Sequence, residues 1–275
     1  MRSSRGMCIS SLPSSRCGVQ MVSRCARRWK FRIPRRAQAT ACFQRREHCD
    51  ATGRLVQLDQ GSEEWHEKRM NLLTASDCAN AAGFFGSEAL ERLWREKVTK
   101  INSFSGNDMT RHSNAHEHFA LRDFATLFGR EVRPGLFYEQ LAAGGFLGVS
   151  PDGHVSFRSG EGLLEMKCPS KADNEFGPEF AEPPQNLKPW YYMQIQQQLA
   201  VANLELAGYW SWTLNKGCLL VRVDRDREFW NQLYPLLCEF WDCVEAGRQV
   251  YALNGTEHER FKCASHPHVV LCEQK

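Results

Sequence analysis

Helical and strand-like patterns of apolar and polar residues alternate along the chain from residue 55 onward. These patterns predict helices over residues 62–70, 74–83, 87–99, 114–128, 190–203 and 226–247. They predict strands over residues 131–132, 135–138, 146–149, 163–168, 206–213 and 218–223. Polar loops are expected over 102–113 and 170–187. The order of elements predicts one α/β domain in which a small mixed β-sheet is flanked by helices.

Individual residues mark where several of these elements begin and end. Ser62 and Asp226 are side chains that cap helix N-termini, and Gly129 is typical of a helix C-terminus. The Leu-Asn-Lys-Gly stretch at 214–217 predicts a hairpin turn. Pro235 lies inside the last helix and is expected to kink it.

The net charge of +3 is the average of two unlike parts of the chain. Residues 1–50 hold 11 Arg and 1 Lys against Glu47 and Asp50, a net charge of +10, which leaves −7 for the remainder. The globular part, expected over 54–250, is therefore acidic, and its composition makes no case for nucleic-acid binding. Contact with DNA would have to come from local basic patches or from bound metal ions.

The N-terminal residues 1–53 are expected to be a basic tail, and residues 251–275 a C-terminal tail. The first 46 residues contain no Asp or Glu and are rich in Arg, Ser and Cys, which is typical of a transit peptide for a mitochondrion or plastid. The alternative is a disordered basic arm that touches DNA or RNA, in a protein of the cytoplasm or nucleus. Met7 and Met21 are further candidate start residues. No apolar run approaches the roughly 20 residues of a membrane helix, so no membrane association is expected.

The twelve cysteines form no C-x-x-C pair and no set with zinc spacing. We expect free thiols in a reducing compartment. Cys263, His266, His268 and Cys272 cluster near the C-terminus. A metal knuckle is one interpretation of this cluster, and a loose polar tail is the favoured one.

The pattern that suggests chemistry is Asp152, followed thirteen residues later by Glu165-Met166-Lys167. Residues i and i+2 of a strand point to one face about 7 Å apart, so Glu165 and Lys167 should face together. A hairpin-like return would bring Asp152 beside Glu165, and two adjacent carboxylates repel unless a cation lies between them. Oxygen ligands of this kind suit Mg²⁺ or Mn²⁺. The set fits phosphodiester hydrolysis, with Lys167 orienting water or stabilising charge.

A plainer interpretation competes with this one. An Asp before a turn glycine is common, and Glu-x-Lys on a strand is often a solvated ion pair. The apolar residues Leu163 and Leu164 before the charges, and Cys168-Pro169 after them, instead indicate a central strand. Charges on a central strand need a reason.

The surrounding residues resemble the phage lambda exonuclease family, also called YqaJ-like viral recombinases, within the PD-(D/E)xK nuclease superfamily. The resemblance spans about residues 60 to 245 and rests on five motifs in the family's order. These motifs lie at Trp65–Arg69 with Leu73–Ser76, His116-Glu117, Gly148–Gly153, Gly162–Pro169 and Tyr192–Gln196. The resemblance implies a restriction-endonuclease-like core. The family usually has Trp-Gly before His-Glu, where this chain has His112 and Ser113.

The resemblance also implies roles for individual residues. Asp152, Glu165 and the backbone carbonyl of Met166 would bind metal, with Glu117 a further acidic group. Lys167 would be the catalytic lysine, and Gln194 would orient a group at the active site. Arg69 and Ser76 would hold a 5′-terminal phosphate, which agrees with the expected place of Ser76 at a helix N-terminus.

Each of the accessory residues also has a plain structural interpretation. Arg69 would be a surface residue, Ser76 an N-cap and Glu117 a first-turn acid. Three helical glutamines would form a solvated face: Gln194, Gln197 and Gln198.

The leading hypothesis is a magnesium-dependent exonuclease that degrades one strand of linear duplex DNA from a 5′ end, in recombination, repair or turnover. The resemblance further implies rings of identical subunits and, in phage members, a strand-annealing partner. An RNase or a structure-specific endonuclease on the same fold is the second hypothesis, and a non-catalytic nucleic-acid-binding module is the third. The cysteine pattern argues against iron–sulfur nucleases, which need a set of four cysteines.

Overall fold

The computed structural model describes residues 53–101, 106–141, 145–169, 187–214, 217–250 and 269–271, and the structural statements below concern these residues. The predicted N-terminal tail before Gly53 lies outside them. So do the cluster of Cys263, His266, His268 and Cys272, and the expected loop up to residue 186.

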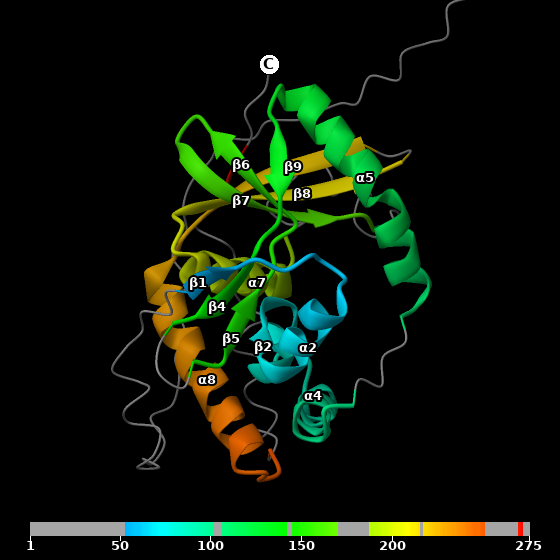
Figure 1. Ribbon diagram of the computed structural model, residues 1–275. Coiled ribbons are helices and arrows are strands. Elements are labelled where there is room, and N and C mark those ends of the chain that lie inside the picture. Colours follow the sequence, from blue (N-terminus) through cyan, green and yellow to red (C-terminus); the bar gives the residue numbers. More distant parts are fainter. Residues whose placement is uncertain are drawn as a thin grey trace, which may run out of the picture.

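The strands form two mixed sheets (Figure 1), so the α/β class is confirmed, with two sheets where one was expected. The larger sheet has the order β10-β9-β8-β7-β6-β3, in which only the β7–β8 pair is parallel. The smaller has the order β1-β4-β5-β2, with β2 and β5 parallel. The strands are β1 (Gly53–Val56), β2 (Leu73–Thr74), β3 (Val132–Pro134), β4 (Phe137–Gln140), β5 (Leu147–Val149), β6 (Gly153–Phe157), β7 (Gly160–Lys167), β8 (Leu206–Thr213), β9 (Gly217–Asp224) and β10 (Val269–Leu271).

The helices begin and end largely where caps predict. They are α2 (Glu63–Asn71), the short 3-10 turn η2 (Ala75–Asp77), α3 (Cys78–Ala81), α4 (Ser87–Thr99), α5 (Asp108–Phe128), α7 (Pro189–Ala202) and α8 (Arg227–Glu245). The Ser62 hydroxyl accepts from Trp65 N, and the Asp226 carboxylate accepts from Phe229 N. Gly129 follows α5 with φ of 59°. Pro235 lies within α8 as expected.

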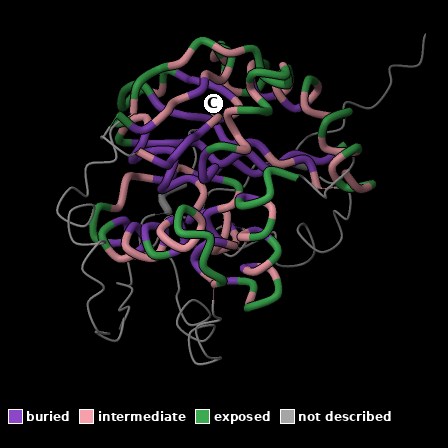
Figure 2. Tube along the Cα trace, turned by 60° about the horizontal axis from the view of Figure 1, so that its bottom comes forward, coloured by how far each residue is buried: buried purple, intermediate pink, exposed green. Residues whose placement is uncertain are grey.

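The larger sheet has a hydrophobic core on each face. On one face α5 packs Ala120 and Phe124 against residues that include Leu164, Met166 and Trp210. On the other face α7 packs against a larger core that also takes in the smaller sheet and α8 (Figure 1). Buried residues accordingly gather along the strands, and exposed ones on the outer helices (Figure 2). β7 has apolar packing on both faces and is therefore a central strand, as its sequence predicted.

Helix α7 lies between the two sheets and is buried on nearly every side. Its buried residues run from Tyr192 and Met193 through Ile195 to Val201, with three consecutive glutamines among them. Two of these glutamines bind backbone of neighbouring elements. The Gln196 side chain donates to Asp224 O at 2.9 Å and accepts from Asp226 N at 2.8 Å, and Gln197 donates to Leu73 O at 3.1 Å. These bonds tie α7 to β9, the start of α8, and β2.

The structure differs from the sequence-based prediction in several places. Helix α5 begins at Asp108 rather than near 114, because the Asn107 side chain caps it by accepting from Thr110 N at 2.9 Å. Strands β1 and β6 were not predicted. The stretch 251–275, expected to be a tail, contributes β10, which pairs with β9.

Two absences hold for the part of the chain that is described. No helix there combines the length and apolar character that spanning a membrane requires. The cysteines there, five in number, are all free: Cys78, Cys168, Cys218, Cys238 and Cys243.

Candidate active site

Asp152 lies beside Glu165 through the antiparallel pairing of β6 and β7. Gly153 pairs with Leu164, so Asp152, directly before β6, lies opposite Glu165 near the end of β7. Its Oδ2 accepts a hydrogen bond from Met166 N at 2.6 Å. The predicted hairpin-like return is therefore confirmed, and it places two carboxylates next to each other.

Gly135 allows the chain to pass close to this return. A Cβ added at Gly135 would lie 1.9 Å from the carbonyl oxygen of Pro151, a distance no side chain tolerates. The link between β3 and β4 therefore packs directly against the residue before Asp152. This contact helps to hold the position of Asp152.

Glu165 is a buried carboxylate, with 1% of its surface exposed. Its Oε1 accepts hydrogen bonds from Lys167 Nζ and from Gln194 Nε2, the latter at 2.7 Å. Its Oε2 accepts from Gln198 Nε2 at 2.6 Å. An ionised carboxylate in an apolar interior is unfavourable unless such donors replace its water, so these three side chains make the site tenable.

The electrostatics of the pair favour a bound cation. Burial, together with the charge of Glu165, raises the pKa of Asp152 well above its usual range. Burial alone would lower the pKa of Lys167, but the charges of Glu165 and Asp152 outweigh it and raise that pKa. The lysine is therefore an ammonium at neutral pH. A cation bound beside Asp152 would oppose the rise in its pKa and favour its ionised form.

The donor set at this position suits a hard cation. Asp152 Oδ2 accepts from Met166 N, and the neighbouring Glu165 supplies further carboxylate oxygens. Carboxylate oxygens are the ligands that Mg²⁺ and Mn²⁺ prefer. No group of three or more His, Cys, Asp and Glu side chains lies close enough to enclose a metal in the described ranges. The candidate protein ligands here are thus Asp152 and Glu165, with the backbone carbonyl of Met166, the residue after Glu165.

Glu117 lies near this pair without joining it in one ligand group. It sits in the middle of α5, not in the first turn, because α5 begins at Asp108. Burial and the charge of Glu165 raise its pKa, and Lys167 opposes the shift. These interactions place Glu117 within electrostatic range of the site, in keeping with a role through water.

Arg69 and Ser76 are brought together as the resemblance implies. Arg69 Nη2 donates to Ser76 Oγ at 3.0 Å, and the guanidinium lies 4.4 Å from the centre of the Trp65 ring. The Trp65 indole in turn donates to Ser150 Oγ at 3.3 Å, two residues before Asp152. Burial lowers the pKa of Arg69, and the charges of Asp77, Glu165 and Asp152 counteract this shift. Arg69 is therefore close to the carboxylates as well as to Ser76.

Ser76 is not a helix cap. It lies inside η2, whose N-cap is Thr74, while Asp77 precedes α3. Its hydroxyl is 3.0 Å from Thr74 Oγ1, which donates to Asp77 Oδ2 at 2.7 Å. The plain N-cap interpretation is therefore wrong for Ser76, and its hydroxyl contacts polar partners beside Arg69.

Lys97 binds two residues of this cluster, Arg69 and Asp77, and was not predicted from the sequence to do so. It is 2% exposed, and its Nζ donates to Arg69 O at 2.9 Å and pairs with Asp77 Oδ2 at 3.2 Å. The sequence pattern of an amphipathic helix predicts an exposed lysine at this position. Only the tertiary contacts reveal that Lys97 is buried and paired.

A protein-family profile for the YqaJ-like viral recombinase domain matches residues 64–205. The chain belongs to this family. The matched range contains Arg69, Glu117, Asp152, Glu165 and Gln194, so the site described above lies wholly within the YqaJ-like domain. No curated protein sequence matches the chain.

Solved structures show the same fold. An alkaline exonuclease from Laribacter hongkongensis, LHK-Exo, is 21% identical over 74% of this chain and 100% of its own, with a TM-score of 0.58. The same enzyme in complex with dAMP is 22% identical over 68% and 94%, also with a TM-score of 0.58. A phage-related exonuclease from Haemophilus somnus is 14% identical over 64% and 96%, with a TM-score of 0.50. At these identities the likeness concerns the fold.

Gln198 is a residue of the site that the sequence analysis did not predict. A run of glutamines predicts a solvated helix face, yet Gln197 and Gln198 are buried, and Gln198 binds Glu165. Their burial shows that the solvated-face interpretation is wrong for both. The signal that would have found Gln198 is its spacing of four from Gln194, which places both amides on one helix face.

We expect Gln198→Leu to lower the free energy of unfolding by about 1.5–3 kcal/mol, the typical cost of losing a hydrogen bond to a charged group. In a Glu165→Gln background the same change should cost only about 0.5–1.5 kcal/mol, because the partner is neutral. Urea unfolding of the four proteins measures this difference.

Gln197→Leu is the matched control, since it removes a buried amide on the same helix that binds a backbone carbonyl. Its cost should be equal in both backgrounds. Equal costs for Gln198→Leu in the two backgrounds would refute the coupling between Gln198 and Glu165.

Proposed function

We propose that this protein is a divalent-metal-dependent exonuclease that degrades one strand of linear duplex DNA from the 5′ end. The observation that carries the proposal is the buried Glu165 carboxylate, held by two amides and Lys167 next to Asp152. A charge buried on a central strand lowers the stability of the fold, and such unfavourable placement of a titratable group is typical of a functional site. Membership of the YqaJ-like family supports the choice of phosphodiester hydrolysis.

Each side chain then has a defined task. Asp152 and Glu165 would hold Mg²⁺ or Mn²⁺, with Glu117 acting through water. The bound ion supplies Lewis acidity toward the phosphate and lowers the pKa of water. Lys167 is kept protonated by its acidic neighbours, so it donates hydrogen bonds to the attacking water or to a phosphate oxygen as negative charge develops. Gln194 and Gln198 prevent Glu165 from rotating away.

The pair of Arg69 and Ser76 supports action at an end rather than within a strand. A guanidinium next to a hydroxyl is a suitable receptor for a phosphate group, which Arg binds through two parallel hydrogen bonds. Trp65 stacks on this guanidinium and restrains it. A terminal 5′-phosphate seated there would place the next phosphodiester near Asp152 and Glu165. The fold relative LHK-Exo has been solved with dAMP, a nucleoside monophosphate of the kind an exonuclease releases.

The family also bears on the biological setting. We propose a role in DNA recombination, repair or turnover, with a strand-annealing protein as the partner in recombination, and the YqaJ-like recombinase domain supports the recombination part. We further propose that residues 1–53 direct the chain to a mitochondrion or plastid, on the strength of their acid-free, Arg-rich composition. A fluorescent reporter fused to residues 1–53 should collect in an organelle, and a diffuse cytosolic signal would reject this part.

Lys167→Ala and Glu165→Ala should each slow degradation of linear duplex DNA with Mg²⁺ by at least about 10²- to 10³-fold, the typical loss when a charge-stabilising group is removed. Release of labelled nucleotides from 5′-labelled and 3′-labelled duplexes measures both rate and direction. Lys100→Ala and Glu91→Ala, which change side chains outside the site, are the matched controls.

Undiminished degradation in both variants would contradict the assignment of the site. Equal cutting of closed circular DNA would indicate an endonuclease instead, and a preference for RNA would identify an RNase. Binding without cleavage in the wild-type protein would favour the non-catalytic module.

Arg69→Ala should reduce the preference for 5′-phosphorylated over 5′-hydroxyl ends. We expect a loss of about 10- to 150-fold, because a charge-assisted contact to phosphate contributes about 1.5–3 kcal/mol. Initial rates on paired duplexes that differ only in the terminal phosphate give this ratio. Arg95→Ala, an exposed arginine of α4, should leave it unchanged. A ratio that Arg69→Ala does not alter would refute the phosphate pocket.

A further inference from the structure

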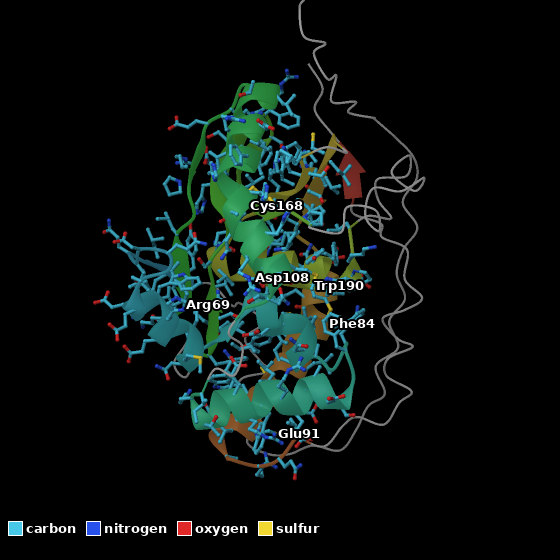
Figure 3. The ribbon with its side chains drawn as sticks, turned by 90° about the vertical axis from the view of Figure 1, so that its right-hand side faces the viewer. Arg69, Phe84, Glu91, Asp108, Cys168 and Trp190 are labelled. Atoms are coloured by element: carbon cyan, nitrogen blue, oxygen red, sulfur yellow. The ribbon has the colours of Figure 1, made fainter. Side chains whose placement is uncertain are left out.

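A row of aromatic rings leads from the catalytic lysine to the protein surface. The Lys167 ammonium lies 5.2 Å from the centre of the Tyr191 ring, and the Tyr191 and Trp190 rings are 5.6 Å apart. Trp190 contacts Phe84 at 5.9 Å and Phe85 at 5.5 Å. Figure 3 shows Phe84 and Trp190 side by side. The outermost ring, Phe85, is 46% exposed, while Phe84 beneath it is buried.

Helix geometry places Trp190 on the side of α7 that faces the site. Residues spaced by four lie on one face of a helix, and Trp190, Gln194 and Gln198 have this spacing. Gln194 and Gln198 both bind Glu165. Trp190 therefore lies one turn farther along the same face, about 6 Å toward the helix N-terminus.

Exposure alone would not distinguish these rings, because single exposed apolar residues are normal on any protein. Their position does. Two partly exposed rings next to each other, supported by a buried third and linked through Tyr191 to Lys167, match the platforms on which proteins stack bases. Bases stack on such rings whatever their sequence, which suits an enzyme that must accept every nucleotide in turn.

We propose that Trp190 and Phe85 form a stacking platform for one nucleobase of the strand being degraded, on the 3′ side of the scissile phosphate. The proposal deepens the proposed exonuclease function and rests on it. In Figure 3, Arg69 is labelled on one side of the view and Trp190 with Phe84 on the other. The contacts from Lys167 through Tyr191 to Trp190 give a strand with its 5′-phosphate at Arg69 a path past Lys167 to Trp190.

The distances define which nucleotide the platform would take. The Trp190 ring lies within about 11 Å of the Lys167 ammonium, the combined length of the two contacts through Tyr191. Successive nucleotides of a stacked strand are about 3.4 Å apart. The platform is therefore within reach of the second to fourth nucleotides from the 5′ end.

Binding of short 5′-phosphorylated single strands, each with one abasic site, tests the platform. The full chain carrying Glu165→Gln is used with Mg²⁺, and electrophoresis afterwards verifies that the strands are intact. An abasic site at one position among nucleotides two to four should weaken binding by about 5- to 150-fold, the range for stacking of one base on an aromatic ring. Abasic sites farther along should have smaller effects.

The aromatic variants make the test specific. Trp190→Leu should bind the intact strand about as weakly as the parent protein binds the abasic strand. In this variant the abasic site should lower the affinity only slightly further. Trp190→Phe should recover most of the affinity, because a ring remains. Phe85→Leu changes a more exposed ring and should show the same pattern at smaller size. Phe157→Leu is the matched control and should bind like the parent. Phe157 is a partly exposed ring at the end of β6 that pairs with Gly160, at the end of β7 away from Lys167.

The outcomes separate this proposal from the function it rests on. A position-specific abasic effect that persists in Trp190→Leu, or the absence of any such effect, overturns the platform while cleavage by the wild-type protein remains a separate result. A change of oligomeric state in Phe85→Leu with unaltered binding would identify a subunit contact and also overturn it. Conversely, a wild-type protein that shows the platform effect but degrades no DNA would refute the exonuclease alone.

Discussion

The burial of one carboxylate, Glu165, is the constraint on which the rest of the structure depends. Its strand has apolar packing on both faces, so the charge has almost no access to water. Gln194, Gln198 and Lys167 supply the donors that water would otherwise provide. Asp152 adds a second carboxylate instead of a counter-charge, and a bound divalent cation would stabilise the ionised form of both.

Helix α7 meets this constraint and also joins the two sheets. Its amides reach Glu165 on one side, the backbone of β2 through Gln197 on another, and the β9–α8 junction through Gln196. A helix with polar groups at its centre is tolerated there because each of these amides donates a hydrogen bond to a fixed acceptor. The placement of the carboxylate and the assembly of the two sheets are therefore parts of one hydrogen-bonded arrangement.

Local rules predicted much of this site. The two-residue period of a strand put Glu165 and Lys167 on one face, and the hairpin turn between β6 and β7 returned Asp152 to Glu165. Tertiary contacts decided the rest. Gln198 and Lys97 look like surface residues in sequence, and only packing buries them. Strand β6 is short and contains polar residues, while α5 starts early because Asn107 caps it, so neither boundary followed from hydrophobic period.

The central claim is that Asp152 and Glu165 together bind a divalent cation, and electron paramagnetic resonance of Mn²⁺ tests it most directly, without DNA or turnover. Titration of the metal-free full chain should convert the free-ion signal into bound signal, and excess Mg²⁺ should reverse it. Asp152→Asn and Glu165→Gln should each abolish most of this binding while circular dichroism shows an intact fold. Unchanged Mn²⁺ binding in both folded variants would contradict the account.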